Sequence, residues 1–378
     1  MTITIGVIGG GQLARMMIPP AVELGLRLRV LAETEGASAA LAADAVGDYR
    51  DAGTVLAFAR EVDVITFDHE HVPQPVLAAL VDAGVAVHPG PEALAVAQDK
   101  LLMRSRLSAL GVPVPRWAAV TGEAELAAFL DAHGGKAVVK TPRGGYDGKG
   151  VRVVEEPAQV ADWFASAQED GNPGVLLAEE FVPFRRELAQ LVARRPSGQL
   201  VAWPLVQTVQ AGGVCAEVYA PAPGADPGLG ERAEQIARTI AEGLGVTGVL
   251  AVELFETEDG GLLVNELAMR PHNSGHWTIE GSVTSQFEQH LRAVADLPLG
   301  ATEARAPSVV MVNVLGGPAE GTIEDLYPEV LGLYPAAKVH SYGKAPRPGR
   351  KLGHVTACAE RFDSALSIAR GAASALLG

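Results

Sequence analysis

A pair of acidic residues stands out in the segment AVELFETEDGGLLVNELAMRP, residues 251–271. The dipeptide at 259–260, Asp-Gly, favours a two-residue hairpin turn, and that turn would place Glu253 directly across from Glu266. Side chains opposed in this way lie roughly 4.5–5.5 Å apart, where like charges are destabilising. A cation would offset the repulsion, and carboxylates are ligands that Mg²⁺ prefers. The alternative, two solvated glutamates, is weakened by the apolar residues around them. Asn265 would point to the opposite face unless a bulge intervenes.

The loop that follows, RPHNSGHWT at residues 270–278, combines basic and amide side chains. Zinc binding by His272 and His276 is disfavoured, because a proline and a glycine oppose a helical His-x-x-x-His pair and no third soft ligand is near. A basic loop beside a magnesium site better suits a small oxyanion. A second basic turn, RPGRKLGH at residues 347–354, is ordinary solvated surface if taken alone.

A glycine-rich stretch, AVVKTPRGGYDGKGVRVV at residues 137–154, lies between two apolar runs that predict a hairpin. One interpretation is an exposed hairpin whose lysines guard a sheet edge. The other is a lid whose backbone N–H groups fold over a triphosphate, assisted by Lys140. The stretch does not match G-x-x-x-x-G-K-[ST], so it does not indicate a P-loop.

The chain opens with a second glycine loop, ITIGVIGGGQLARMM at residues 3–17. The spacing Gly9-x-Gly11-x-x-Ala14, with Glu33 22 residues beyond Gly11, fits a dinucleotide-binding fingerprint. An oxidoreductase is therefore one hypothesis. The glycines alone show only that a backbone can approach an anion at a helix N-terminus, and a phosphate of the substrate is the other hypothesis.

The elements that would position these residues follow from the pattern of apolar runs. The first ~90 residues alternate short apolar runs with helix-like segments, which is typical of a parallel sheet. Residues 91–110 predict one continuous helix, and residues ~116–180 a small α+β unit. Strands dominate from residue ~183 onward, with helices predicted at 230–244 and 285–295.

Composition excludes several classes of protein. The net charge of −15 over 378 residues argues against nucleic acid as a partner. No apolar run approaches the ~20 residues of a membrane span, and the N-terminus has no signal-peptide pattern. The two cysteines provide neither metal spacing nor a disulfide framework. We therefore expect a cytoplasmic protein with no membrane partner.

Four segments, taken in order, resemble a known family. GGYDGKG, EEFVPFRRE, VELF with VNELAMRPHNSGHWT, and RPGRKLGH resemble the ATP-grasp ligases of purine synthesis, most closely the 5-(carboxyamino)imidazole ribonucleotide synthase family. The resemblance covers nearly the whole chain. It implies an α/β and α+β ATP-grasp fold, with an N-terminal doubly wound parallel-sheet domain (1–95), a central lid domain (96–182) and a C-terminal domain (183–378).

The resemblance also implies an activity. ATP, with Mg²⁺ held by Glu253 and Glu266, would drive carboxylation of 5-aminoimidazole ribonucleotide by bicarbonate through carboxyphosphate, in a homodimer. The expected ATP site comprises Lys100, Lys140, Gly144, Gly145, Tyr146, Asp147, Gly148, Lys149, Gly150, Glu179, Glu180, Phe181, Val182, Glu187, Gln210, Asn265 and Glu266. The expected ribonucleotide and bicarbonate site comprises Gly11, Gln12, Glu70, Tyr146, Asp147, Lys149, Ser274 and Arg350, together with the catalytic candidates Arg270, His272, Asn273 and Lys351.

Within this set the resemblance implies distinct roles. The two lysines Lys100 and Lys140 would contact the ATP phosphates, and Glu187 would bind the ribose hydroxyls. Adenine would be read by Glu179 and the backbone at 181–182. The chain departs from the family pattern at Asp68, Lys100, Lys149, Gln210 and Met269.

Two alternatives stay open beside this hypothesis. A sister ATP-grasp ligase, such as a formate-dependent glycinamide ribonucleotide transformylase, would share the ATP site but not the pairing of PHNSGHW with RPGRKLGH. A catalytically silent nucleotide-binding regulator is hard to reconcile with the paired glutamates.

Overall fold

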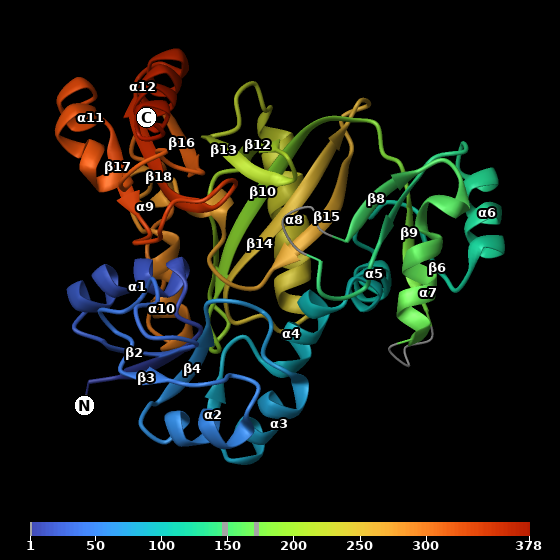
Figure 1. Cartoon of the computed structure of the whole chain (residues 1–378), viewed down its shortest axis with the longest axis horizontal. Helices are drawn as coiled ribbons and strands as arrows, with labels where there is room; N and C mark the ends of the chain where they lie inside the picture. The colour runs from blue at the N-terminus through green and yellow to red at the C-terminus, as the bar shows by residue number, and fades with distance from the viewer. Residues whose placement is uncertain (1, 146–149, 170–173) are drawn as a thin grey trace.

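The computed structural model describes residues 2–145, 150–169 and 174–378, and it arranges them around separate β-sheets (Figure 1). The N-terminal part lies at the lower left of Figure 1, the lid at the right, and the largest sheet runs between them to the C-terminus at the upper left. No helix in these described ranges is long and apolar enough to cross a membrane.

The N-terminal sheet is parallel, in the order β3-β2-β1-β4-β5, as the alternating pattern predicts. Its strands are β1 (Thr4–Ile8), β2 (Arg27–Ala32), β3 (Ala45–Val46), β4 (Val64–Phe67) and β5 (Ala86–Val87), and its helices are α1 (Gln12–Glu23), α2 (Ala52–Ala59) and α3 (Gln74–Asp82). The central strands β1 and β4 are almost fully buried, since helices cover both faces of such a sheet.

The segment that joins this sheet to the lid corrects one prediction. Two helices, α4 (Pro91–Gln98) and α5 (Lys100–Ala109), replace the single predicted helix over 91–110. Asp99 adopts an extended conformation between them, and its carboxylate accepts hydrogen bonds from the backbone N–H groups of Leu101 and Leu102. This side chain caps α5, and it makes Lys100 the first residue of that helix.

The lid is a small antiparallel sheet in the order β6-β9-β7-β8, covered by helices on one side (Figure 1). Its elements are β6 (Trp117–Val120), α6 (Glu123–Ala132), β7 (Ala137–Lys140), β8 (Val151–Val154), the 3₁₀ helix η1 (Pro157–Val160), α7 (Ala161–Glu169) and β9 (Leu176–Glu180). Strands β7 and β8 pair as the predicted hairpin that flanks the glycine-rich loop.

The largest sheet has the order β15-β14-β10-β12-β13-β16-β18-β17, with β11 paired to β10. Its strands are β10 (Phe184–Arg194), β11 (Leu200–Ala202), β12 (Val206–Ala211), β13 (Val214–Ala220), β14 (Gly248–Thr257), β15 (Leu262–Ala268), β16 (Ser308–Leu315), β17 (Lys338–Ser341) and β18 (Lys351–Ala359). The accompanying helices are α8 (Pro227–Gly243), η2 (Asn273–Gly275), α9 (Thr278–Gly281), α10 (Gln286–Val294), η3 (Ile323–Leu326), α11 (Tyr327–Leu333) and α12 (Phe362–Ala375).

Helix α10 ties the largest sheet to the N-terminal part. Its side chains Phe287, Leu291 and Val294 are buried in one cluster with the N-terminal residues Leu13 and Met17 of α1. Burying a side chain of this size stabilises a fold by roughly 1.5–3 kcal/mol. The first and last thirds of the chain therefore share a hydrophobic core.

Candidate active site

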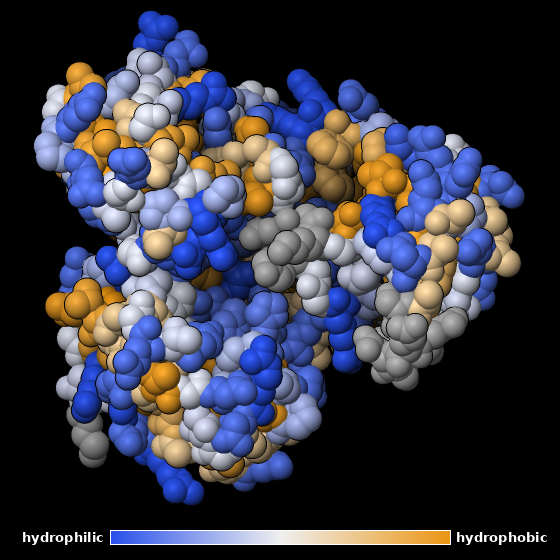
Figure 2. All heavy atoms as spheres, viewed as in Figure 1, coloured by the Kyte–Doolittle hydropathy of each residue, from blue (hydrophilic) through white to orange (hydrophobic). Residues whose placement is uncertain are grey.

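A cleft of about 1070 Å³ opens where the N-terminal part, the lid and the largest sheet meet. Figure 2 shows a hollow between the N-terminal part and the lid, bordered by hydrophilic residues. Most of the residues expected from the sequence line this cleft: Gln12, Glu70, Lys100, Lys140, Gly144, Gly145, Glu179, Glu180, Phe181, Val182, Glu187, Gln210, Glu253, Asn265, Glu266, Arg270, His272, Asn273 and Lys351. Segments far apart in sequence thus converge on one cavity.

The hairpin of β14 and β15 places its two acidic residues as predicted, but its turn and register differ from the prediction. Glu253 lies directly opposite Glu266. The turn, however, is longer than the predicted two residues, because Glu256 pairs with Leu262 and the backbone N–H of residue 257 bonds to the carbonyl of residue 261. Gly260 takes a left-handed φ of 80° in this turn, as three-residue hairpin loops require.

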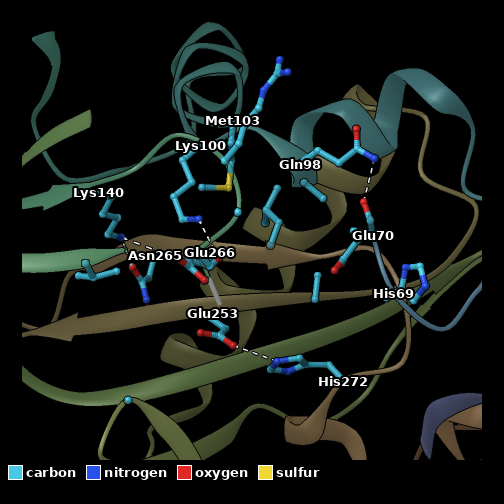
Figure 3. Close-up of a pocket in the computed structure, with 18 of the residues that line it drawn as sticks. His69, Glu70, Gln98, Lys100, Met103, Lys140, Glu253, Asn265, Glu266 and His272 are labelled. Atoms are coloured by element: carbon cyan, nitrogen blue, oxygen red, sulfur yellow. Dashed lines mark hydrogen bonds and ion pairs between the residues drawn. The ribbon is translucent and has the colours of Figure 1, made fainter. Parts of the chain in front are cut away.

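A β-bulge compensates for the longer turn. The register shifts between residues 253 and 254, so that Asn265 becomes an extra residue on β15. The shift restores the opposition of the two glutamates, and it turns the Asn265 amide toward the cleft beside Glu266 (Figure 3). The bulge that the sequence left open is therefore present.

Lysine side chains from other elements approach this bulged edge. The ammonium of Lys140, at the end of β7, donates to the Asn265 Oδ1 at 3.1 Å and lies 4.0 Å from the Glu266 Oε1 (Figure 3). Lys100 Nζ donates to the carbonyl of Gly145 in the glycine-rich loop at 3.3 Å. The cleft therefore offers cations beside carboxylates, a pattern suited to a metal–phosphate complex.

A buried ion pair underlies the same edge. Glu179, only 3% exposed, binds Lys140 Nζ at 2.8 Å and also accepts from the guanidinium of Arg104. Arg104 is fully buried and donates in addition to the carbonyl of Asn265 at 2.6 Å. Burial opposes ionisation of Glu179, yet Lys140 and Arg104 hold its pKa below its ordinary value. The Arg104 side chain thus holds the bulge directly, and it holds Lys140 through their shared partner Glu179.

The face around Glu253 carries a third carboxylate. Glu187 lies two residues from Ala189, the partner of Glu253 on β10, so all these side chains share one face of the sheet. Burial and the neighbouring charge of Glu253 raise the pKa of Glu187 to about 7. For Glu253 itself, burial acts to raise the pKa, but the hydrogen bond from His272 and the charges of Lys140 and Arg270 lower it below its ordinary value.

His272 faces Glu253 from the loop after β15, with its Nε2 3.1 Å from the carboxylate Oε1 (Figure 3). The backbone N–H of Ser274 donates to His272 Nδ1 at 3.3 Å, and the Ser274 hydroxyl lies 2.9 Å from the same atom. Because an N–H group can only donate, Nδ1 is the unprotonated nitrogen of the neutral ring. The proton on Nε2 therefore points at Glu253.

The N-terminal part contributes Glu70, which follows β4. Its carboxylate accepts from Arg270 Nε at 2.9 Å and from the backbone N–H of Met269 at 3.1 Å. The side chain of Gln98 donates to the carbonyl of Glu70 at 2.8 Å (Figure 3). These bonds fix the basic loop against the N-terminal part.

The opening glycine loop has its amides satisfied by the protein itself. Asp68 accepts from the backbone N–H groups of Gly11 at 3.1 Å and Ala14 at 2.7 Å, and burial raises the pKa of this carboxyl. Glu33, the acid of the fingerprint, accepts from the N–H of Gly10 at 3.1 Å, and the hydrogen bond from His69 holds its pKa at about 2. The fingerprint describes the backbone correctly, but protein carboxylates occupy its anion positions.

Some expected residues do not line the cleft or fall outside the described ranges. Gly11, Gly150, Ser274 and Arg350 are absent from its lining; Ser274 is buried behind His272, and Arg350 donates to the carbonyl of Ala345. The expected contacts at 146–149, namely Tyr146, Asp147, Gly148 and Lys149, lie outside the described residues.

Sequence reasoning missed Arg104 and the capping role of Asp68. Arg104 belongs to no motif, and its only signal is a charge beside the buried residues Met103 and Leu107 of an amphipathic helix. Asp68 was visible only as a departure from a family pattern. Gln98, which joins α4 to Glu70, has no sequence signal of its own.

Comparison with known proteins agrees with this arrangement. Family models match residues 1–98 (ribonucleotide synthetase preATP-grasp domain), 105–287 (ATP-grasp domain) and 309–367 (phosphoribosylaminoimidazole carboxylase C-terminal domain). The chain is 51% identical to the N5-carboxyaminoimidazole ribonucleotide synthase of Corynebacterium ammoniagenes, over 99% of this chain and 92% of the relative. It is also 51% identical to the enzyme of that name from Mycobacterium tuberculosis strain H37Rv, over 93% of this chain and 82% of the relative. The chain belongs to the N5-carboxyaminoimidazole ribonucleotide synthase family.

Solved structures of this family share the whole fold. The synthetase from Thermus thermophilus is 39% identical, with a TM-score of 0.87 over 99% of this chain and 98% of that one. The Aspergillus clavatus enzyme in complex with ADP and 5-aminoimidazole ribonucleotide is 31% identical, with a TM-score of 0.88 over 99% and 98%. The family assignment confirms an ATP-grasp ligase, and it leaves the oxidoreductase, transformylase and silent-regulator alternatives without support.

Proposed function

We propose that the chain carboxylates 5-aminoimidazole ribonucleotide with bicarbonate, using ATP and Mg²⁺ and releasing ADP and phosphate. The single observation that carries the proposal is the cleft itself, which joins the opposed pair Glu253 and Glu266 to the basic loop at 270–273. The relatives named for this product, one of them in complex with ADP and 5-aminoimidazole ribonucleotide, support it.

ATP would lie between the lid and β14–β15. Lys100 and Lys140 would contact its phosphates, where positive charge stabilises the oxygens of the group in transfer. The apolar wall of the cleft, to which Met103 and Leu267 contribute, suits the adenine ring, and the backbone at 181–182 would read its edge. Glu187 would accept hydrogen bonds from the ribose hydroxyls.

The residues present fit a bound Mg²⁺. Glu253 and Glu266 oppose each other, and the bulge adds the amide oxygen of Asn265 on the same side. Oxygen ligands with two negative charges match the preference of a hard divalent cation. When bound, the ion would neutralise charge on the ATP phosphates.

The other end of the cleft suits bicarbonate and the ribonucleotide. Arg270, Asn273 and Lys351 line it together with His272. Arginine offers a planar fork that matches a bicarbonate oxygen pair. The Arg270 Nε donates to the Glu70 carboxylate at 2.9 Å. This bond fixes the plane of the guanidinium, and with it the direction of its two terminal nitrogens.

The reaction would proceed in two steps. A bicarbonate oxygen attacks the γ-phosphorus of ATP, and the bond to ADP breaks to give carboxyphosphate. The exocyclic amine then forms a bond to the carboxyl carbon, directly or after carbon dioxide is released in the cleft, while phosphate leaves and the amine loses a proton. Exclusion of water would protect the labile carboxyphosphate.

An ADP-release assay that omits each substrate in turn tests the proposal. We expect release to require bicarbonate and 5-aminoimidazole ribonucleotide together. Release that depends instead on formate and glycinamide ribonucleotide would overturn it.

A further inference from the structure

Gln286, the first residue of α10, grips the backbone of the loop that carries His272. It is fully buried, and its amide makes two bonds to one residue: the Oε1 accepts from the His272 N–H at 2.9 Å, and the Nε2 donates to the His272 carbonyl at 2.8 Å. A buried, bidentate amide of this kind satisfies both backbone groups of the residue that it holds.

The same amide reaches a third group. Gln286 Nε2 lies 2.9 Å from His276 Nδ1. Since its oxygen must accept from an N–H group, the amide orientation is determined, and its NH₂ donates to His276. The ring of His276 is fully buried, and burial lowers its pKa well below the ordinary value, so it accepts this bond as a neutral imidazole. The clamp therefore fixes both ends of the loop segment 272–276.

By holding the backbone of His272, the Gln286 amide also sets the position of the His272 imidazole in the cleft. With the backbone of His272 held, the Ser274 N–H meets Nδ1, and Nε2–H points at Glu253. Elsewhere on α10, Phe287, Leu291 and Val294 pack into the core shared with α1. Helix α10, which is packed into that core, thus supports the loop at residues 272–276.

We propose that Gln286 is a positioning residue, which holds the His272 imidazole in register with the Glu253 carboxylate during carboxylation. This inference rests on the proposed function. Gln286 itself does not line the cleft, so it can act on a ligand only through His272. A displacement of the order of 1 Å in a catalytic group can cost about 100-fold in rate, so loss of the clamp should slow turnover without preventing ATP binding.

Helix α10 offers a matched control in Gln289. This side chain is also fully buried and also makes a bidentate clamp, accepting from the Gly300 N–H at 2.8 Å and donating to the Gly300 carbonyl at 2.8 Å. Gly300 lies in the segment after α10 and outside the cleft lining. Gln286→Leu and Gln289→Leu therefore each remove a bidentate clamp from one helix. The first also removes the bond to His276, and only the first bears on His272.

The test compares the two variants by ADP release in the presence of bicarbonate and 5-aminoimidazole ribonucleotide. We expect both variants to lose Tm, Gln286→Leu by more because it also loses the bond to His276. For Gln286→Leu we expect in addition a fall in kcat of about 100-fold, with the KM for ATP unchanged within about twofold. For Gln289→Leu we expect kcat within about twofold of wild type. Equal kcat losses in both variants, or none in Gln286→Leu, would overturn the proposal.

A second pair of variants covers the case in which Gln286→Leu does not fold. Gln286→Glu keeps the size of the side chain, but its carboxylate cannot donate to the His272 carbonyl, whereas its protonated form can. We expect its kcat relative to wild type to fall as pH rises, and the ratio for Gln289→Glu to stay flat. A flat ratio for both would contradict the proposal.

A nitrogen NMR measurement separates this inference from the proposed function. In protein labelled with ¹⁵N-histidine, the His272 signals, identified by their loss in His272→Gln, should report a proton on Nε2 in wild type and Gln289→Leu. Gln286→Leu should lose that tautomer preference. If the His272 spectrum of Gln286→Leu is the same as that of wild type, the positioning role is wrong, and this holds even if the protein releases no ADP.

Discussion

The N-terminus of α1 and the β14–β15 edge are both built to hold charge, but they differ in what already fills them. At the α1 terminus, Asp68 accepts from the N–H groups of Gly11 and Ala14, and Glu33 accepts from Gly10. At the β14–β15 edge, Glu253 and Glu266 oppose each other with like charge. One place is a neutralised structural cap; the other carries a charge imbalance that a ligand can relieve.

The difference shows why the sharper sequence motif was the poorer guide to function. A glycine fingerprint reports only that backbone amides are available, and here other side chains use them. Two directly opposed carboxylates repel each other, and at this edge Lys140 and His272 offset the repulsion. A bound cation would offset it further, so the pair is suited to binding one. The β14–β15 edge is therefore distinguished from the N-terminus of α1 by the repulsion between its charges, and resemblance to a motif is the weaker guide.

The largest effect should come from breaking the carboxylate pair. Glu266→Gln should reduce ADP release by about 100- to 1000-fold, because the charge that would hold Mg²⁺ beside the phosphates is halved. Its Tm should match or exceed that of wild type, since a like-charge repulsion is removed. Glu258→Gln, an exposed residue in the turn of the same hairpin, is the control. Wild-type turnover in Glu266→Gln would remove the metal assignment.

Removing the cap of α1 should affect stability. Asp68→Ala leaves the N–H groups of Gly11 and Ala14 without their partner, so the free energy of unfolding in urea should fall by about 1–2 kcal/mol. Asp51→Ala, which removes the exposed cap of α2 at Thr54, should cost less because water can replace it. Equal losses in the two variants would contradict a special structural role for Asp68.

The charge imbalance at the sheet face should appear as a pH dependence. The pKa of Glu187 is about 7 in the fold, above its ordinary 4.5, so its contribution to stability is complete below about pH 4.5 and is lost as the pH rises through 7. Comparing urea unfolding of wild type and Glu187→Gln across this range should show the wild type losing stability relative to the variant. A constant difference between the two would show that Glu187 ionises normally.

Nicotinamide dinucleotides should have no effect, because we expect them not to bind. Titration with NADH or NADPH, followed by nicotinamide fluorescence, should give no saturable change, because the fingerprint amides already bond to Asp68 and Glu33. A saturable signal that disappears in a Glu33→Gln variant would show that the N-terminus of α1 is a ligand site, contrary to the comparison with the β14–β15 edge.

Much of the fold was accessible from the sequence because apolar periodicity reports burial. The parallel sheet and the lid hairpin follow from it. The hairpin at Glu253 illustrates the limit: the predicted pairing with Glu266 is confirmed, yet the predicted two-residue turn is wrong, and a bulge at Asn265 cancels the error. Turn length and bulge position depend on partners such as Arg104, which lies 161 residues away from Asn265 in the chain.

Side chains that act on backbone were the least predictable part of the site. Gln286 holds His272 from 14 residues away, and Asp68 caps Gly11 from 57 residues away. Such bonds follow from tertiary packing, and no spacing or periodicity announces them. Residues that would touch ligands could be found by family resemblance; those that hold them in place required the fold.

The core shared by α1 and α10 has a consequence for how the molecule can be divided. A chain that begins at residue 99 would leave Phe287 and Leu291 facing water, although both belong to the last third of the sequence. Exposing each would forfeit roughly 1.5–3 kcal/mol, a substantial part of the stability of an ordinary domain. The N-terminal part is therefore no exchangeable module: recombination between relatives at that boundary should succeed only when α10 is exchanged together with α1.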